Sequence, residues 1–326
     1  MKIGRRDIVT PSPVGEMAAG SPAAISRSWY EGSLTAFAFT FALIAFLFVG
    51  NLVYRAWPVI GHQPLKLLTS ANWGSDVGQF GALSQIVGTL QSSVGAVLIA
   101  VVVGIAATLA IVFLVPRRLR VITATLIELL AAVPSVVYGA WGFIALGPWA
   151  LKHVEPFLGR LPLASHIFGP ANQYASQSLL LAMVVLAVMV LPTFVAVARE
   201  VISSVPQDLI EASQSLGATW WQTMWRVVIP ASRIGLFGAA SLALARAAGE
   251  TVAVLFIIGG SATIQWHLLM PGTTLASWIA GQFGESSGVG INALMALGVL
   301  LMIINFSLAL VSQRMISNQR RRLAAS

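Results

Sequence analysis

The chain has 326 residues, of which 57% are hydrophobic and 9% are charged, and its mean hydropathy is +0.84. Soluble domains carry roughly 25% charged residues, so this composition excludes an ordinary soluble globular protein and predicts an all-α integral membrane protein. The formal net charge of +8 therefore bears on membrane orientation instead of nucleic-acid binding, and the absence of cysteine excludes disulfides and thiol catalysis.

The first 33 residues are rich in proline, serine, glycine and arginine and contain no apolar core. We expect them to form a disordered segment. A cleavable signal peptide would place a shorter apolar region earlier and end in a small-residue cleavage site, so we expect the first apolar segment to be retained.

Six apolar segments follow and predict a six-span membrane domain over residues 34–315, with a basic tail at 316–326. The predicted spans are about 34–54, 88–115, 121–146, 177–198, 234–259 and 290–312.

The third span contains a proline in the run ELLAAVPSVVYGAWGFIAL. Pro134 removes a backbone donor and frees a carbonyl about one turn earlier, so we expect a kink there. Ser135 can supply one hydrogen bond, and Tyr138 lies on nearly the same face. The break is either a packing kink or a point that lines a path through the membrane. We expect Glu128, nearer the end of the span, to have a structural role in which it reaches the membrane surface or pairs with one of the arginines at 117, 118 and 120.

A polar interruption, 199–233, separates the fourth and fifth spans. Its part from Glu211 to Pro230 reads as two short helices folded about Gly217. Pro206 suits the first position of the first helix, and Gly217 supplies the positive φ that ends it. Thr219 with Gln222 predicts a capping box that begins the second helix, and Pro230 is expected to end it.

The fifth span contains two ionisable residues, Arg246 and Glu250, in LALARAAGETVAVLFIIGG. Charged groups cost about 2.5–3.5 kcal/mol each at the centre of a membrane helix, so they normally face a cavity or a partner. A spacing of four predicts that both lie on one helix face. They either form a neutralising salt bridge, or Arg246 attracts an anion while Glu250 holds the arginine and tunes release.

The lysines and arginines predict that both termini are cytoplasmic, because cytoplasmic loops carry an excess of positive charge. In that orientation 14 of the 19 are inside, four are outside and Arg246 is within a span. The 14 are Lys2, Arg5, Arg6, Arg27, Arg117, Arg118, Arg120, Arg199, Arg226, Arg233, Arg314, Arg320, Arg321 and Arg322.

The chain lacks a G-x-x-x-x-G-K-[ST] phosphate loop, a nucleophile elbow and an H-E-x-x-H motif. We therefore expect neither ATP hydrolysis nor another enzymatic activity from this chain. The four histidines (His62, His153, His166, His267) lack metal-ligand spacing, so no metal site is expected.

Three motifs together resemble the phosphate-specific ABC transporter permease subunit of the PstC type. They are the EAA-like loop (Glu211-Ala212-Ser213, Gly217, Pro230), PSVVYG at 134–139 and RAAGET at 246–251. The outer segments Phe80-Gly81-Ala82-Leu83 and Gly88-Thr89-Leu90 are also similar to that family.

This resemblance implies the type I ABC importer permease fold in a bacterial inner membrane. It also implies three partners: a second, PstA-type permease, a dimeric PstB-type ATPase that uses ATP and Mg, and an external PstS-type phosphate-binding protein. It assigns the ATPase socket to Glu211, Ala212 and Gly217, and we add Pro230 of the same loop. It implicates Arg246 and Glu250 in transport and implies no cofactor for this chain. To the expected transport path we add Thr251 of the same motif and, from the break in the third span, Pro134, Ser135 and Tyr138.

Other functions are compatible with parts of this pattern. A sulfate or molybdate permease would share the EAA loop but is not expected to carry RAAGET. A secondary anion transporter predicts broken helices in two matching halves and no ATPase socket. A non-transporting sensor of phosphate is a third class. The PstA-type permease shares much of the pattern, so the subunit type rests on the longer outer loops.

Overall fold

The computed structural model describes residues 27–324 except 63, 75–77, 161–164 and 170–175. Backbone contacts divide the chain into two compact units, residues 1–51 and 52–326. In unit 1 the described residues form most of helix α1 (Arg27–Ile60), and its last residues belong to unit 2. The predicted disordered segment 1–33 lies largely outside the described residues, although α1 begins within it.

The regular secondary structure of the described part of the chain is helical apart from one short hairpin, β1 (Trp73–Gly74) and β2 (Gln79–Phe80), and an isolated bridge between Gly259 and Gly272. This confirms the predicted all-α membrane class. Five of the described helices are long and apolar enough to cross a membrane. A sixth span results if the bent pair Arg118–Ala132 and Ser135–Leu158 counts as one. The five are Gly32–Ile60, Leu83–Leu114, Leu179–Ser203, Trp220–Ala248 and Val289–Arg314.

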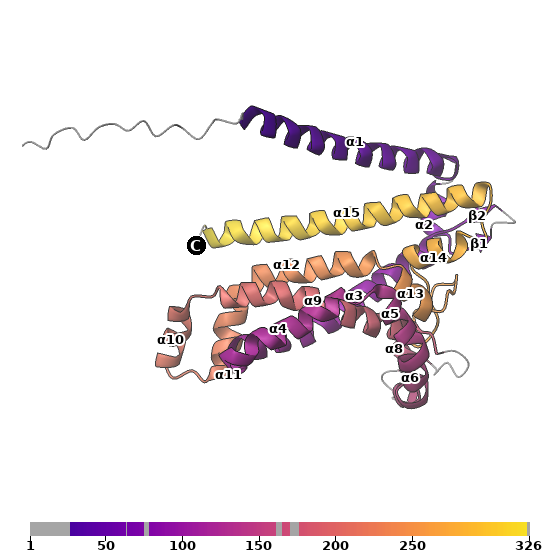
Figure 1. The fold of residues 1–326 in the computed structure, drawn as a ribbon. Coiled ribbons are helices and arrows are strands. Elements are labelled where there is room, and N and C mark those ends of the chain that lie inside the picture. The colour runs from indigo at the N-terminus through magenta and orange to yellow at the C-terminus, as the bar shows by residue number, and fades with distance from the viewer. Residues whose placement is uncertain (1–26, 63, 75–77, 161–164, 170–175, 325–326) are drawn as a thin grey trace, which may run out of the picture. The chain divides into compact units, whose positions relative to one another are not determined.

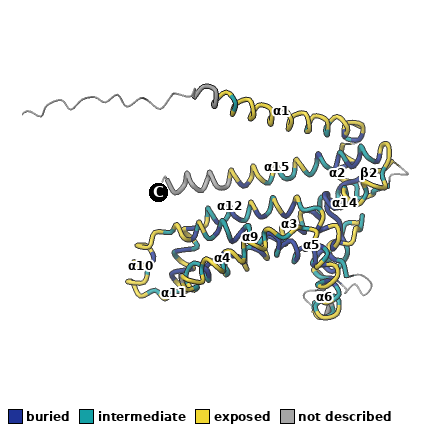
Figure 2. Tube along the Cα trace, viewed as in Figure 1, coloured by how far each residue is buried: buried dark blue, intermediate teal, exposed yellow. Residues whose placement is uncertain are grey.

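The main core of unit 2 lies between three long helices, α3 (Leu83–Leu109), α9 (Leu179–Ser203) and α12 (Ile229–Ala248) (Figures 1 and 2). Ala96, Ala100, Ala239 and Ala243 are fully buried there. Such small side chains let membrane helices approach closely. Phe194 of α9 is also fully buried in this core.

A second core in unit 2 lies under the last helix, α15 (Val289–Ala324). Leu294 and Leu297 from α15 pack with Leu67 of α2 (Pro64–Thr69), Leu275 of α14 (Leu275–Gln282) and Ala56 of α1. This core brings the ends of four helices together.

Two of the predicted spans are broken helices. The third divides into α4 (Arg117–Ala132) and α5 (Ser135–Trp141), and the fifth into α12 and α13 (Val252–Ile257). The segment after α5 continues through the π-helical turn η2 (Gly142–Leu146) into α6 (Gly147–His153), α7 (Glu155–Arg160) and α8 (Ser165–Phe168).

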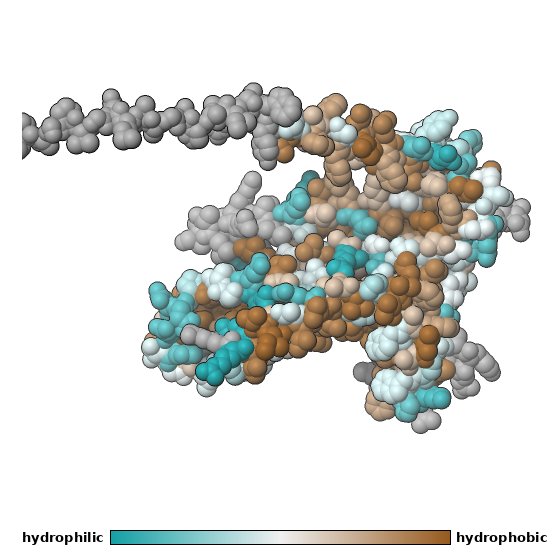
Figure 3. Space-filling model, viewed as in Figure 1, coloured by the Kyte–Doolittle hydropathy of each residue, from teal (hydrophilic) through white to brown (hydrophobic). Residues whose placement is uncertain are grey.

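The polar interruption forms α10 (Gln207–Ser215) and α11 (Trp220–Thr223) at one end of unit 2, whereas α6, α8 and α14 lie at the other end (Figure 1). Apolar side chains cover much of the helices between these ends, and hydrophilic side chains gather at the α10–α11 end (Figure 3). This distribution is typical of a protein whose helices face lipid and whose ends face water.

Candidate functional site

The α10–α11 hairpin, residues 207–223, is built by local signals that the sequence analysis predicts. Gly217 has a φ of +86°, a conformation that side chains with a Cβ rarely adopt, and it ends the first helix. Thr219 and Gln222 form a complete capping box at the start of α11. Pro206 is the residue before α10, with ψ of 133°, and not its first helical residue as predicted.

The two helices of the hairpin are held together by a side-chain contact that the sequence did not reveal. The hydroxyls of Ser213 and Thr223 lie 3.1 Å apart. Ser213 stands where the resemblance expects a second alanine, so this chain adds a hydrogen bond there. Ile210 is buried against the main core and anchors α10.

Pro230 does not end the second helix, which corrects the prediction. The π-helical turn η3 (Met224–Val228) follows α11, and the helix continues to Ala248 with Pro230 in the first turn of α12. A π turn widens the backbone spacing, and a proline is tolerated in the first turn of a new helical segment. The hairpin is therefore joined to the fifth span by continuous helix.

The surface of the hairpin is more apolar than a solvated loop requires. Leu216, beside Gly217, is 90% exposed, and Leu209 is 48% exposed. Glu211 and Ala212 are also exposed.

At the break before α5, Tyr138 supplies the hydrogen bond that Pro134 cannot donate. Proline cannot donate to the carbonyl four residues earlier, which is that of Leu130. The Tyr138 hydroxyl donates to this carbonyl at 2.8 Å, and the tyrosine is buried. Ser135, which is predicted to be able to supply a hydrogen bond at the break, begins α5, and the hydrogen bond to Leu130 comes from Tyr138 instead.

The break in the fifth span separates Arg246 from Glu250, which corrects the prediction of one shared helix face. Helix α12 ends at Ala248, and Gly249 is its cap. Arg246 is exposed and donates to the Thr193 hydroxyl of α9 at 3.1 Å. Glu250 instead accepts from the Ala253 amide at 3.4 Å, at the start of α13.

The two breaks lie beside each other in unit 2. Helix α5 packs on α13, where a Cβ at Gly139 would lie 2.8 Å from the Cα of Ala253, so only glycine allows this approach. Thr251 is the residue before α13, and its hydroxyl donates to the Gly249 carbonyl at 3.3 Å.

Two further polar residues belong to this region, and the sequence analysis missed them. Thr193 binds Arg246, and Asn305 of α15 places its amide nitrogen 3.9 Å from the Cβ position of Gly249. The Asn305 amide oxygen is buried without a hydrogen-bond partner. A signal was present, because each is a polar residue within an otherwise apolar span.

Glu128 pairs with a different arginine from those predicted. Its carboxylate accepts from Arg199 of α9 at 2.9 Å, across 71 residues of sequence. The predicted partners, the arginines at the start of α4, lie on the same helix about two to three turns away. The pair links α4 to α9 at the end of unit 2 that carries the hairpin.

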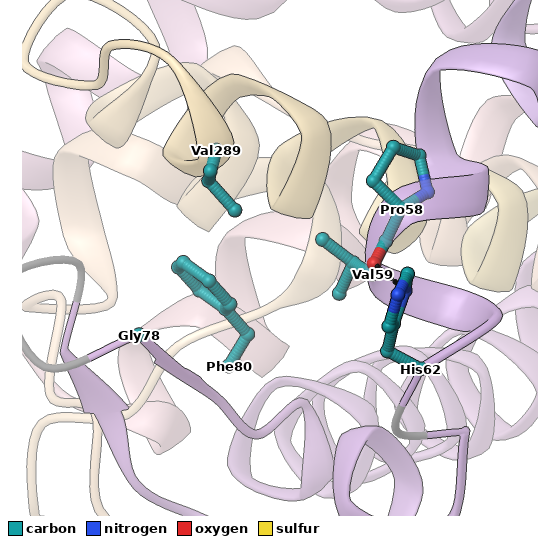
Figure 4. Close-up of a pocket in the computed structure, with 6 residues that line it drawn as sticks. All are labelled: Pro58, Val59, His62, Gly78, Phe80 and Val289. Atoms are coloured by element: carbon teal, nitrogen blue, oxygen red, sulfur yellow. Dashed lines mark hydrogen bonds between the residues drawn. The ribbon is translucent and has the colours of Figure 1, made fainter.

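The end of unit 2 opposite the hairpin carries a small pocket of about 110 Å³ (Figure 4). Phe80 of the β-hairpin, Val289 of α15 and Val59 of α1 line it, together with Pro58, His62 and Gly78. His62 contacts the Pro58 carbonyl through Nδ1 at 2.8 Å. No lysine or arginine lines this pocket, so it lacks the charge that an oxyanion site needs.

The comparisons with known proteins decide the family. Residues 100–317 match the family described as the binding-protein-dependent transport system inner membrane component. The chain belongs to this family. It is therefore a multi-pass inner-membrane component of a transport system, and the family implies no cofactor and no catalytic role for it.

Curated relatives cover most of the chain. The phosphate transport system permease protein PstC of Pasteurella multocida is 37% identical over 284 residues, which are 85% of this chain and 88% of that protein. The PstC protein of Haemophilus influenzae is 35% identical over 304 residues, 91% of this chain and 96% of that protein. The PstC protein of Mycobacterium leprae is 36% identical over 262 residues, which are 78% of this chain and 82% of that protein.

A solved structure shares the fold. The MetNI methionine ABC transporter in an inward-facing conformation matches with a TM-score of 0.50 and 18% identity, covering 71% of this chain and 92% of that chain. At this identity the likeness shows the type I ABC importer permease fold alone. No group of three histidine, aspartate or glutamate side chains that could hold a metal ion occurs in the described part of the chain.

Proposed function

We propose that this chain is the permease subunit of an ATP-driven importer of inorganic phosphate and forms the path with a second permease. Relatives named as phosphate transport permeases, 35–37% identical over most of the chain, support the substrate. One observation carries the proposal: the charged side chain of Arg246 lies next to a helix break and donates a hydrogen bond to the neutral hydroxyl of Thr193.

The environment of Arg246 suits a passing oxyanion. No carboxylate of the described residues lies within 4 Å of its guanidinium nitrogens, so none in that part of the chain forms an ion pair with it. A guanidinium binds phosphate oxygens with paired N–H donors. The hydroxyl of Thr193 and the amide of Asn305 add neutral polar groups nearby, and conduction favours such weak sites over one tight site.

The six predicted path residues divide into two roles in this proposal. Arg246, Glu250 and Thr251 contact the ion or control its release at the break of the fifth span. Pro134, Ser135 and Tyr138 form the neighbouring break that lets the two half-helices move. The close packing of α5 on α13 supports a joint movement of the two breaks.

The α10–α11 hairpin is the proposed contact with a separate ATPase of the PstB type, which would use ATP and Mg. Exposed Leu216 and Leu209 supply apolar contacts, and Glu211, Ala212 and Gly217 lie in the same hairpin. Continuous helix from Trp220 through Pro230 to Ala248 supports transmission of movement from the hairpin toward Arg246. A PstA-type permease and a PstS-type binding protein complete the proposed transporter.

The proposed orientation places the hairpin and both termini in the cytoplasm. The distribution of lysine and arginine supports it, with 14 on the inner side and four on the outer side. The membrane domain in this proposal covers residues 34–315, with the coupling loop at 199–233, a cytoplasmic segment before it and a basic tail after it.

The proposed function is tested by uptake of labelled oxyanions into cells that express the chain with its co-encoded transporter subunits. We expect phosphate uptake, and we expect Arg246→Gln to lower it about tenfold or more, because one charged hydrogen-bond donor is lost. Arg233→Gln is the matched control, since Arg233 lies on the same helix, is exposed and is distant in sequence from the break.

The same assay distinguishes the alternatives. Uptake of sulfate or molybdate but not of phosphate would indicate another oxyanion permease. Phosphate uptake that persists without the ATPase subunit would indicate a secondary transporter. Normal expression with unchanged uptake in Arg246→Gln would show that the path does not use this arginine.

A further inference from the structure

A second cavity lies at the base of the α10–α11 hairpin, at the opposite end of unit 2 from the pocket of Figure 4. Its volume is about 340 Å³, and its walls come from η1 (Ala110–Leu114), α4, the end of α9 and the start of α10. The lining residues are Val112, Phe113, Arg120, Ile202, Ser203, Val205, Gln207 and Ile210. A water molecule occupies about 30 Å³ of liquid, so the cavity has room for a phosphate group with its water.

Arg120 is the charged residue among those that line this cavity. Its Nε is buried and has no hydrogen-bond partner, and no ion pair to Arg120 occurs among the described residues. The acidic residues Glu200 and Asp208 are exposed nearby in the sequence, and neither lines the cavity. Arg120 as a whole is half-buried, and burying its Nε without a partner is costly, so an acceptor from outside the described chain would stabilise it.

The other polar groups of the cavity are compatible with an anion. Gln207 is the first residue of α10, and Pro206 before it provides no side-chain cap, so the first amides of this nine-residue helix have no side-chain acceptor. The Ser203 hydroxyl donates to the Glu200 carbonyl and presents its oxygen beside the cavity. A guanidinium and a helix N-terminus that line one cavity are a combination that favours a phosphate group.

We propose that this cavity binds a phosphate group between Arg120 of α4 and the start of α10. The group comes either from inorganic phosphate or from the headgroup of an anionic phospholipid, because both present the same oxygens. When bound, it bridges α4 and α10 and restrains the hairpin against the bundle. If the proposed function holds, an occupied site slows the movement that couples the ATPase to the path, so that the bound group regulates transport from the hairpin side.

Binding is measured on the full chain in nanodiscs, in an Arg246→Gln background that removes the proposed path site. In one arm the discs contain phosphatidylcholine alone, and inorganic phosphate is titrated calorimetrically. In the other arm the discs contain phosphatidylglycerol without free phosphate, and retained lipid is counted by native mass spectrometry. We expect Arg120→Gln to weaken binding about tenfold or more in one arm, which identifies the source.

The matched control is Arg118→Gln, because Arg118 lies on the same helix, carries the same charge, is exposed and does not line the cavity. It should bind like the parent chain, and Arg120→Lys should retain part of the affinity if both variants are folded. Equal binding by Arg118→Gln and Arg120→Gln in both arms, or no binding in either arm, overturns the proposal.

A second readout does not depend on transport. Binding should slow amide hydrogen exchange in residues 207–215 of the parent chain and of Arg118→Gln, and it should not do so in Arg120→Gln. Unchanged exchange in all three would contradict the bridge between α4 and α10. If Arg246→Gln loses phosphate uptake but still binds at the Arg120 cavity, the transport path and the cavity are independent sites, and each proposal can fail without the other.

Discussion

At the scale of single residues, charged side chains found partners that sequence spacing did not predict. A spacing of four suggested that Arg246 and Glu250 share a helix face, but the helix ends between them. Arg246 instead binds Thr193, and Glu128 binds Arg199 of another helix. Spacing rules assume an unbroken helix, and they carry no information about the neighbouring helix that supplies a partner.

Tyr138 provides a residue-scale prediction. Tyr138→Phe removes the donor to the Leu130 carbonyl, which the proline leaves without its helical partner. We expect a loss of about 1 kcal/mol in stability, measured as a lower midpoint of thermal unfolding of the purified protein. Tyr54→Phe is the control, because Tyr54 is 81% exposed. Equal effects of the two substitutions would show that the hydrogen bond to Leu130 does not stabilise the break.

At the scale of elements, the α10–α11 hairpin was predictable and its continuation was not. A glycine with positive φ and a capping box depend on residues a few positions apart, so the local sequence predicts the turn and the helix start. Pro230 was expected to end a helix, yet the π turn before it lets the helix continue to Ala248. Met224 and Val228 of that turn are buried in the main core and stabilise it. No local sequence pattern predicts the turn.

Gly217 provides an element-scale prediction. No atom lies within 4 Å of the position of a Cβ there, so Gly217→Ala is unfavourable only because of its φ of +86°, at a cost of about 1 kcal/mol. We expect less ATPase to co-purify with this variant, because the hairpin samples other conformations. Gly217→Asn should behave more like the parent, since asparagine tolerates this conformation. Equal behaviour of both variants and the parent would show that the turn does not control docking.

At the scale of the whole molecule, composition alone predicted the class of protein. Long apolar runs in a chain with 9% charged residues predict helical membrane spans, and the described residues contain five, or six if the bent pair counts as one. The juxtaposition of the breaks near Pro134 and Gly249 was not predictable, because it depends on the packing of Gly139 against Ala253. The cavity at Arg120 also requires two stretches that are distant in the sequence, residues 112–120 and 202–210.

The proposed orientation can be tested directly because the chain contains no cysteine. Single cysteines are introduced in place of Leu216, which is 90% exposed on the hairpin, and Trp266, which is 70% exposed in the loop before α14. A membrane-impermeant maleimide added to intact cells should label Trp266→Cys and not Leu216→Cys. Inside-out vesicles are the control and should reverse the result; the opposite pattern would place the hairpin outside.

The sequence by itself determined the membrane class, the hairpin with its glycine and capping box, the break at Pro134 and the motifs that indicate the family. These features depend on composition or on residues a few positions apart. Only the tertiary structure decided that Arg246 binds Thr193, that Tyr138 completes the broken helix, that the two breaks meet and that Arg120 faces a cavity without a partner. Each of these depends on how helices pack against one another, which local patterns do not encode.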